Sequence, residues 1–301
     1  DSCNIEINTA VIKSDDVAVY IGGAGQVDIT GSFIFGDTGL YIKAGTVNLD
    51  GVIINANGEH KAFVGSDNGA NSTGDAIVLD SRENYIGDIE LNIVSSSIVS
   101  EHGHGIFEIV SRGNACKVTS ITLGIPNEVS VVEFTSELSA IELSDKCSAT
   151  VVHNNNSNLD AFISRNKTTL YYAGFDKCME ALESGDVVET LRNIATFDSF
   201  EIDESITIIF NHRYDYMEES VNAAKENLKY AFNVTGSEVE ATFIINNELE
   251  KQMILENSNY KEENFNSYVM SGLTLPKIIW QITFDSFFIG NYSDKIYQDE
   301  L

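Results

Sequence analysis

Short stretches in the first half of the chain alternate between apolar and polar residues with a period of two. Ile5 and Ile7 flank Glu6, and the same pattern recurs further along. Its later apolar positions are Val27 and Ile29, Val47 and Leu49, Ile89 and Leu91, and Ile121 and Leu123. Side chains alternate between the two faces of a β-strand, so each stretch predicts a strand with one face in a core and the other in solvent.

A second pattern places one small residue directly before two or three apolar ones. It begins at Ala18, Gly39, Ala76, Gly105, Ala140 and Ala161. Apolar pairs lie between the two patterns, at Val11-Ile12, Phe33-Ile34, Val52-Ile53 and Ile98-Val99. A unit of two or three short strands cannot close a core alone, so we expect these repeats to stack on one another.

Stacking would place each strand beside its equivalent one repeat later, in parallel, with apolar side chains in columns inside. A β-meander or sandwich would show hairpin turns between adjacent strands. The small-then-apolar pattern instead recurs once per repeat, which favours a parallel coil.

The segment Thr73-Gly74-Asp75-Ala76-Ile77-Val78 and the strands around it resemble the right-handed parallel β-helix of the pectate-lyase-like superfamily. The resemblance covers about residues 4–165 and is nearest to the non-enzymatic β-helix modules of bacterial cell-surface proteins. It implies a mainly β fold, a right-handed single-stranded parallel β-helix (solenoid) followed by a smaller α+β or diverged β-helix module. Such helices include lyases, hydrolases, adhesins and inert stalks, so the fold alone implies no activity.

The composition changes beyond Leu170, where glycines become sparse and aromatic and acidic residues become denser. We therefore expect residues 1–165 to form the β-helix and residues 166–301 to form a second module. Apolar spacing predicts a short helix near 174–184, similar to the N-terminal cap helix of many bacterial β-helix modules, and another helix near 217–232. Strands are expected over 205–210, 240–246 and 277–289.

The charge balance narrows the range of partners. With 18 Lys and Arg against 46 Asp and Glu, the formal net charge is −28. Such a field repels phosphate backbones and anionic lipid, so we expect no nucleic-acid partner. No apolar run approaches the roughly 20 residues needed to cross a bilayer, so no membrane insertion is expected in this fragment.

Two short motifs are similar to those of polygalacturonase-type β-helix hydrolases, Asp15-Asp16 and Gly103-His104-Gly105. In such hydrolases the motifs lie on neighbouring turns, whereas Asp16 and His104 are several repeats apart here. Hydrolysis also needs a second carboxyl group about 5–10 Å away across the bond, and a lyase needs an acidic Ca²⁺ cluster beside a Lys or Arg base. Neither is recognisable, so we expect no catalytic residues.

Histidine spacing offers one candidate metal site. His102 and His104 are two residues apart, so on one strand they would point the same way and could share a metal, with His60 as a third ligand. Asp67-Asn68-Gly69 could likewise hold Ca²⁺ together with Asp75. No ligand framework surrounds these residues, and polar residues are common in glycine-rich turns, so we expect no metal and no cofactor.

Cysteines and aromatics allow two further hypotheses. Cys116 and Cys147 follow comparable turn starts, with Cys178 one more interval along. Turns stacked about 4.8 Å apart would permit a disulfide, although a column of small buried residues is the expected role. Four aromatic residues near the end of the chain would form a sugar-stacking surface if they were exposed, but their spacing along a strand favours a place in a core. They are Trp280, Phe284, Phe287 and Phe288.

We expect a secreted or bacterial cell-surface protein, a structural or adhesin-like β-helix module within a longer surface protein. Its partner would be carbohydrate or another host or cell-surface ligand. A β-helix polysaccharide hydrolase or lyase is the first alternative, and a spacer with no ligand is the second. An enzyme predicts carboxylates from adjacent turns along one sheet, an adhesin predicts exposed aromatic or polar ladders, and a spacer predicts neither.

Overall fold

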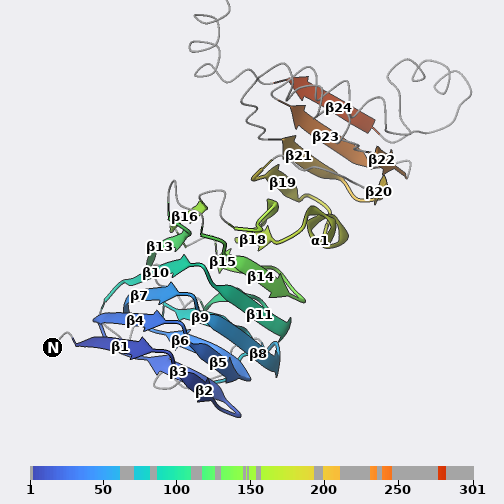
Figure 1. The fold of residues 1–301 in the computed structure, drawn as a ribbon. Coiled ribbons are helices and arrows are strands. Elements are labelled where there is room, and N and C mark those ends of the chain that lie inside the picture. Colours follow the sequence, from blue (N-terminus) through green and yellow to red (C-terminus); the bar gives the residue numbers. More distant parts are fainter. Residues whose placement is uncertain are drawn as a thin grey trace, which may run out of the picture. The chain divides into compact units, whose positions relative to one another are not determined.

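Figure 1 shows the computed structural model of the chain. The structure describes residues 3–61, 71–81, 87–109, 117–125, 130–144, 147, 149–153, 157–192, 199–210, 231–235, 239–245 and 277–282. The chain divides into two compact units. Unit 1 contains Asp1–Asp160 and Ser164–Cys178, and unit 2 contains Ala161–Ile163 and Met179–Leu301. Both are mainly β, with sheets that are largely parallel.

The first sheet of unit 1 has six parallel strands in the order β1-β4-β7-β10-β13-β16. Their bounds are β1 (Asn4–Asn8), β4 (Gln26–Thr30), β7 (Gly45–Asp50), β10 (Ile89–Val94), β13 (Val118–Leu123) and β16 (Thr150–His153). The expected core columns are confirmed, since the alternating apolar residues from Val27 to Leu123 are buried. In β1, Ile5 is exposed instead, because this strand lies at the edge of the sheet with a neighbour on one side only.

The second sheet has five parallel strands in the order β14-β11-β8-β5-β2. Their bounds are β2 (Val11–Lys13), β5 (Phe33–Gly36), β8 (Ile53–Glu59), β11 (Ser97–His102) and β14 (Glu133–Ser136). The apolar pair expected at Val52-Ile53 lies one residue too early in β8. Ile54, rather than Ile53, pairs with Ile34 and Ile98 and is buried with them, and Val52 lies just before the strand.

In the third sheet, the strands of unit 1 follow the order β18-β15-β12-β9-β6-β3. Their bounds are β3 (Val17–Ile21), β6 (Thr38–Ile42), β9 (Ile77–Asp80), β12 (Ile106–Ile109), β15 (Ile141–Ser144) and β18 (Thr168–Tyr172). From β3 to β15 the pairing is parallel and joins equivalent positions, as expected from the small-then-apolar pattern.

The last recurrence of that pattern does not continue the parallel series. The neighbours of β15 are β12 and β18, and β18 is antiparallel, with Ile141 opposite Tyr171. The segment that begins at Ala161 therefore does not take the place beside β15 that the repeat predicted. Thr168–Tyr172 alternates like the other strands, and such a pattern carries no sign of strand direction.

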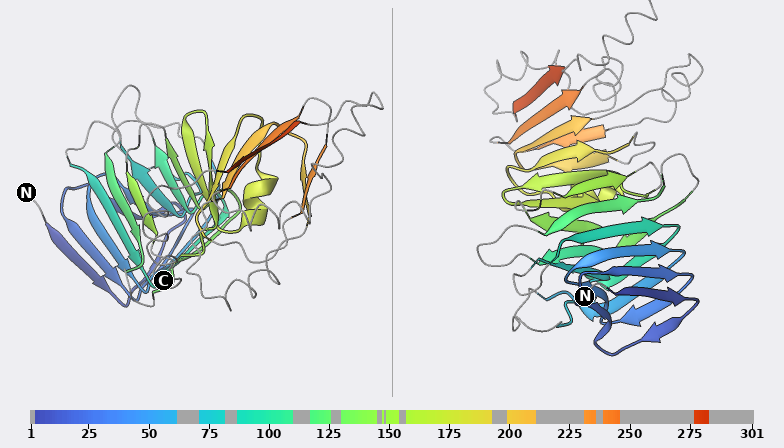
Figure 2. Two further views of the ribbon diagram at one scale, coloured as in Figure 1. Left: turned by 90° about the horizontal axis from the view of Figure 1, so that it is seen from above. Right: turned by 90° about the vertical axis from the view of Figure 1, so that its left-hand side faces the viewer.

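From β1 to β16 the chain visits the first, second and third sheets in rotation, so each strand pairs with the strand three later. Figures 1 and 2 show the resulting rows, in which blue and green strands far apart in sequence lie side by side. This arrangement is compatible with a β-helix-like solenoid.

Small residues begin the third-sheet strands because the backbone of the next repeat passes close by. A Cβ added to Gly105 would lie 2.6 Å from the carbonyl oxygen of Ala140 and 2.8 Å from Cδ1 of Phe134. Both distances are shorter than van der Waals contact, so the position excludes a side chain.

Unit 2 contains two sets of parallel strands. The order β19-β21-β23-β24 links β19 (Val187–Thr190), β21 (Ile206–Phe210), β23 (Glu240–Ile245) and β24 (Lys277–Ile282). Strands lie where they were expected near 205, 240 and 277. A further pair joins β20 (Ser199–Ile202) to β22 (Ala231–Val234).

Two expected helices have different outcomes. The range near 174–184 contains α1 (Phe175–Glu180), which is shorter than expected. Asp160 accepts the backbone N–H of Phe175 at 3.1 Å, which satisfies one N-terminal donor of the helix. The prediction near 217–232 was wrong at its end, because Ala231 and Phe232 pair with β20 in a strand, and the rest of that range lies outside the described residues.

Strand β17 (Ala161–Arg165) includes the division between the units.

Candidate functional site

Four polar residues occupy equivalent positions at or just before the start of strands in the third sheet. Leu40, Ile77, Ile106 and Ile141 pair in succession across β6, β9, β12 and β15. Two residues before each of them in sequence are Thr38, Asp75, His104 and Ser139, which we call the polar column. All four are buried. The repeat therefore stacks polar side chains that come from four different turns.

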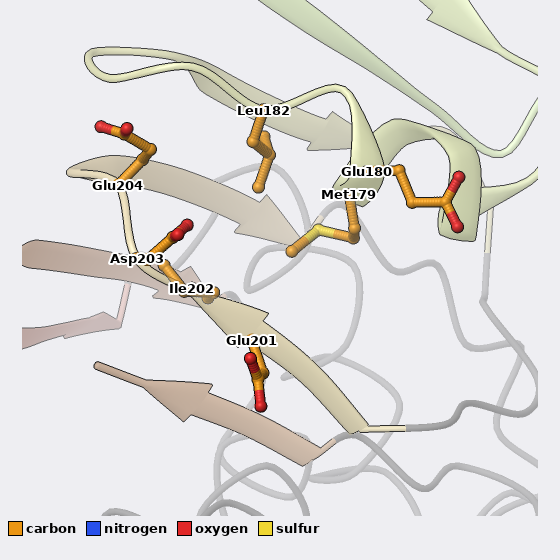
Figure 3. Close-up of a pocket in the computed structure, with 7 residues that line it drawn as sticks. All are labelled: Met179, Glu180, Leu182, Glu201, Ile202, Asp203 and Glu204. Atoms are coloured by element: carbon orange, nitrogen blue, oxygen red, sulfur yellow. The ribbon is translucent and has the colours of Figure 1, made fainter. Parts of the chain in front are cut away.

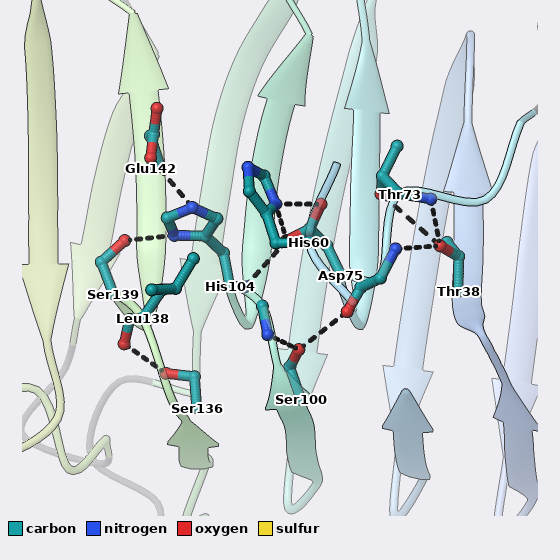
Figure 4. Close-up of polar contacts among 12 residues, drawn as sticks. Thr38, His60, Thr73, Asp75, Ser100, His104, Ser136, Leu138, Ser139 and Glu142 are labelled. Carbon is teal, nitrogen blue, oxygen red and sulfur yellow. Dashed lines mark hydrogen bonds and ion pairs between the residues drawn. The ribbon is translucent and has the colours of Figure 1, made fainter. Parts of the chain in front are cut away.

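Hydrogen bonds connect the polar column along its length (Figure 4). Oγ1 of Thr38 accepts the backbone N–H groups of Thr73 at 2.8 Å and Gly74 at 3.1 Å. Oδ1 of Asp75 accepts the backbone N–H of His104 at 2.8 Å. Nδ1 of His104 lies 2.8 Å from Oγ of Ser139. Buried polar groups need such partners, so the column is self-consistent as a structural element.

His60 joins this column from a different sheet. It directly follows β8 of the second sheet, and its Nδ1 lies 3.0 Å from Oδ1 and 3.3 Å from Oδ2 of Asp75. Its ring meets that of His104 edge to face at 4.8 Å between centroids. The side chain of Asp75 is 0% exposed, whereas that of His60 is 25% exposed and therefore reaches solvent.

Two residues of the third-sheet strands complete the surroundings. The ring of Phe107 stacks on His104 at 5.4 Å and meets His60 edge to face at 5.1 Å, so one apolar wall orients both imidazoles. Glu142, which pairs with Phe107 across β12 and β15, places Oε2 3.1 Å from Nε2 of His104. We call His60, Asp75, His104 and Glu142 the histidine cluster.

The cluster perturbs the protonation of its own members. Burial lowers the pKa of His104 to about 4, so this imidazole is neutral at pH 7. The hydrogen bond to Asp75 raises the pKa of His60 above its ordinary value, and burial raises the pKa of the Glu142 carboxyl. The cluster thus stabilises the protonated form of His60 relative to a free imidazole. It stabilises the neutral form of His104, whose imidazole then has one nitrogen with a free lone pair.

Three members of the cluster can offer atoms to one metal ion. A ring nitrogen of His60, a ring nitrogen of His104 and a carboxylate oxygen of Asp75 all lie within 4.8 Å of one another. Two ligands of a tetrahedral zinc ion are about 3.3 Å apart, and the 3.0 and 3.3 Å separations between His60 and Asp75 are already in that range.

His102 does not belong to the cluster, so the structure does not support the alternative in which it would share a metal with His104. It ends β11, where its exposed ring lies 3.0 Å from Glu137 and 3.9 Å from Glu59. The hydrogen bond to Glu137 raises its pKa. The chain leaves the strand at Gly103, so the period of two that holds within a strand does not extend to His104.

The hydrolase-like motifs stay apart. Asp16 directly precedes β3, the first strand of the third sheet, whereas His104 directly precedes Gly105 and β12. The strands β6 and β9 lie between β3 and β12 in this sheet. At ~4.8 Å per strand the two are about 14 Å apart along the stack. Asp15 and Asp16 are exposed and contribute nothing to the histidine cluster.

Other polar groupings in the described residues do not form a ligand site. A pocket of about 280 Å³ in unit 2 has an apolar floor of Met179, Leu182 and Ile202 (Figure 3). The carboxylates around it include Glu201, Asp203 and Glu204, which are exposed. Solvated carboxylates of one sign repel one another and define no ligand.

In unit 1, Nζ of Lys43 lies 3.1 Å from Oδ2 of Asp80, and the Tyr41 hydroxyl donates to the same oxygen at 2.8 Å. All three residues are buried. This buried ion pair is inaccessible to a ligand from outside, so its role is structural.

The cysteine column does not extend as expected. Cys178 lies in α1 rather than in a stacked turn, and no disulfide is formed by Cys3, Cys147 or Cys178 within the described part of the chain. Cys116 lies outside the described residues, as do Asp67-Asn68-Gly69 and Phe284, Phe287 and Phe288. Trp280 belongs to β24, whose side chains are also outside the description.

Sequence reasoning missed Ser139 and Glu142, and it did not connect Asp75 to His60. A usable signal was present for Ser139, because four of the small residues that open the small-then-apolar pattern are directly preceded by a polar residue, namely Thr38, Asp75, His104 and Ser139.

Comparisons with known proteins add no further assignment. No protein-family model matches the chain, and no curated protein or solved structure is significantly similar to it. Within the described residues, no helix is both long and apolar enough to cross a membrane.

Proposed function

We propose that this chain is a right-handed parallel β-helix of the pectate-lyase-like kind, and that it acts as a structural or adhesive module of a secreted or bacterial cell-surface protein. In this role the stacked strands form a rigid support, and the outer faces of the sheets present binding groups. Carbohydrate or another cell-surface ligand would be the partner.

The observation that carries the proposal is the register of the first sheet. Val27, Val47 and Leu91 pair with their equivalents in successive strands, and all three are buried. A stack of this kind draws its stability from neighbouring repeats, and it can lengthen without building a binding site.

Side chains on the outer face of the same sheet support a role as a rigid stalk. Nδ2 of Asn48 donates to Oδ1 of Asp28 at 2.6 Å, and Nδ2 of Asn92 donates to Oδ1 of Asn48 at 2.9 Å. These hydrogen bonds link three successive repeats from outside, parallel to the apolar columns inside, and so resist slippage between strands.

An exposed apolar surface on the second sheet supports an adhesive role. Phe33 is 42% exposed, and its ring stacks almost parallel to that of Phe35, with centroids 6.5 Å apart and 3° between planes. Val11 and Ile53 pair with Phe33 in the neighbouring strands and are exposed as well. Exposed apolar patches mark interaction sites, and parallel aromatic faces suit the flat apolar face of a sugar ring.

A β-helix polysaccharide hydrolase or lyase is the second candidate. The observation in its favour is the meeting of two carboxylates, Asp75 and Glu142, with two histidines from neighbouring turns. Against it, Asp75 is fully buried and accepts the backbone N–H of His104, so its carboxylate has no free path to a substrate. We therefore place the adhesive or structural role first.

One experiment separates these roles. The purified chain would be incubated with plant, mucin and microbial polysaccharides, and both co-sedimentation and the release of reducing or unsaturated ends would be measured. We expect binding without product release, and weaker binding by Phe33→Ala. Tyr20→Ala is the matched control, because Tyr20 is equally exposed, at 42%, but lies on the third sheet. Product release would contradict the proposal, and equal loss by both variants would contradict the binding surface.

A further inference from the structure

The histidine cluster brings two imidazoles and two carboxyl groups together from neighbouring turns. Asp75 lies 3.0 Å from His60, and Glu142 lies 3.1 Å from His104. Ring nitrogens of His60 and His104 and a carboxylate oxygen of Asp75 lie within 4.8 Å of one another. A divalent cation at this place could take a lone pair from each ring and an oxygen from the carboxylate.

Each donor is already positioned for this purpose by its own local structure. The polar column places Asp75 and His104 on adjacent turns, where the backbone N–H of His104 fixes the carboxylate of Asp75. Phe107 packs against both imidazole rings, and His60 directly follows the end of β8. Ligand atoms held in advance lose little conformational freedom on binding, which favours affinity.

Ser139 is positioned as an outer hydrogen-bond partner of His104. Histidine ligands of metals almost always use their second ring nitrogen in a hydrogen bond that fixes the ring and its tautomer. Nδ1 of His104 has such a contact with Oγ of Ser139 at 2.8 Å. The other ring nitrogen, Nε2, lies 3.1 Å from Oε2 of Glu142.

We propose that His60, Asp75 and His104 bind one divalent transition-metal ion of the zinc type, with Glu142 as a neighbouring carboxylate and Ser139 as the residue that orients His104. Two imidazoles and one carboxylate are a ligand set that suits zinc and disfavours Ca²⁺ and Mg²⁺, which take oxygen ligands. The ion would join the end of β8 and the start of β9 to the start of β12, and would thus connect two successive turns of the repeat, with Glu142 of β15 beside it. This inference does not depend on an adhesive role.

The test is zinc titration of the untagged full chain after dialysis against a chelator, followed by isothermal calorimetry at pH 7.5. We expect one zinc ion per chain with an affinity on the order of micromolar or tighter, and no comparable heat with Ca²⁺. Removal of a histidine ligand should weaken zinc binding by at least about 100-fold, because even loss of an outer partner costs 10- to 100-fold.

His60→Ala and His102→Ala form a matched pair. Both positions are partly exposed and lie at the ends of adjacent strands of the second sheet, so neither change should prevent folding, and circular dichroism would verify this. We expect His60→Ala to lose zinc binding and His102→Ala to retain it. Absence of stoichiometric zinc binding by the unmodified chain, unchanged binding by folded His60→Ala, or equal losses in both variants would overturn the proposal.

His104→Gln supplies a second ligand test, although its buried position makes the fold more sensitive. Ser139→Ala keeps all the ligands, and its expected effect is a 10- to 100-fold loss of affinity. If Ser139→Ala left zinc affinity unchanged, its assigned role in orienting His104 would be wrong.

Discussion

The Asp75 carboxylate accepts the backbone N–H of His104, one repeat further along the chain, with 2.8 Å between Oδ1 and N. The same carboxylate lies 3.0 Å from Nδ1 of His60, which comes from a different sheet. One buried side chain therefore joins two stacked turns to the end of a third strand, and this junction is also the centre of the proposed metal site.

Replacing Asp75 should destabilise the fold even without metal. Asp75→Ala would leave the buried N–H of His104 without its acceptor, and this should cost about 1–3 kcal/mol of unfolding free energy. Asp75→Asn keeps an oxygen acceptor and should cost less. Urea denaturation in the presence of a chelator would measure both, and a larger loss for Asp75→Asn would contradict the assigned hydrogen bond.

Gly105 tests the close approach between repeats. Gly105→Ala would press a Cβ against the carbonyl of Ala140 and the ring of Phe134, at 2.6 and 2.8 Å, so it should cost about 1–3 kcal/mol or more. Gly23→Ala is the matched control, because no atom lies within 4 Å of a Cβ built there. Thermal unfolding of both variants checks the contrast, and equal midpoints would refute this packing.

The pH dependence of stability should report the burial of His104. Its pKa falls from 6.5 in the unfolded chain to about 4 in the folded protein, so the unfolded state binds more protons between these values. The contribution of the neutral His104 to the free energy of unfolding is therefore fully present above pH 6.5, and it is lost as the pH falls toward 4.

The comparison that isolates this effect is between the unmodified chain and His104→Gln, both metal-free. The difference in their unfolding free energies should change by about 3 kcal/mol between pH 7 and pH 4. The raised pKa values of His60 and Glu142 give contributions of the opposite sign, lost as the pH rises, but both residues remain in both proteins. A flat difference over that range would show that His104 is not buried as a neutral imidazole.

The buried pair of Lys43 and Asp80 should be sensitive to loss of one charge. Lys43→Met removes the cation 3.1 Å from the Asp80 carboxylate and should cost about 3–5 kcal/mol, because the remaining charge stays buried. Lys13→Met, at an exposed lysine over the ring of Phe35, should change stability little. Chemical denaturation would test the pair, and similar effects at the two lysines would contradict the burial of Lys43.

Much of the strand order follows from the sequence. The columns through Val27, Val47 and Leu91 could be predicted because alternating burial imposes one register, and a slip of one residue would turn every side chain to the wrong face. Ile53 and Ile54 were harder, because a run of adjacent apolar residues suits either register. The antiparallel entry of β18 could not be predicted, since an alternating strand carries no mark of its direction.

The histidine cluster lay partly beyond sequence reasoning. Asp75, His104 and Ser139 share one position of the repeat, so alignment on the following small residue could have placed them in a column. His60 has no such equivalent, because it follows β8 of the second sheet and contacts Asp75 from outside the column. Local spacing instead favoured His102 as the partner of His104, and the turn at Gly103 separates them.

X-ray absorption at the zinc edge of the zinc-loaded chain tests the metal site most directly. The proposed ligand set predicts nitrogen and oxygen neighbours at about 2.0–2.2 Å, with the scattering pattern of two imidazoles and no sulfur. The same spectrum of His60→Ala should lose one imidazole or show no bound zinc, and that of His102→Ala should be unchanged. Sulfur scattering at about 2.3 Å, or a spectrum of the unmodified chain without imidazole, would contradict the site built from His60, Asp75 and His104.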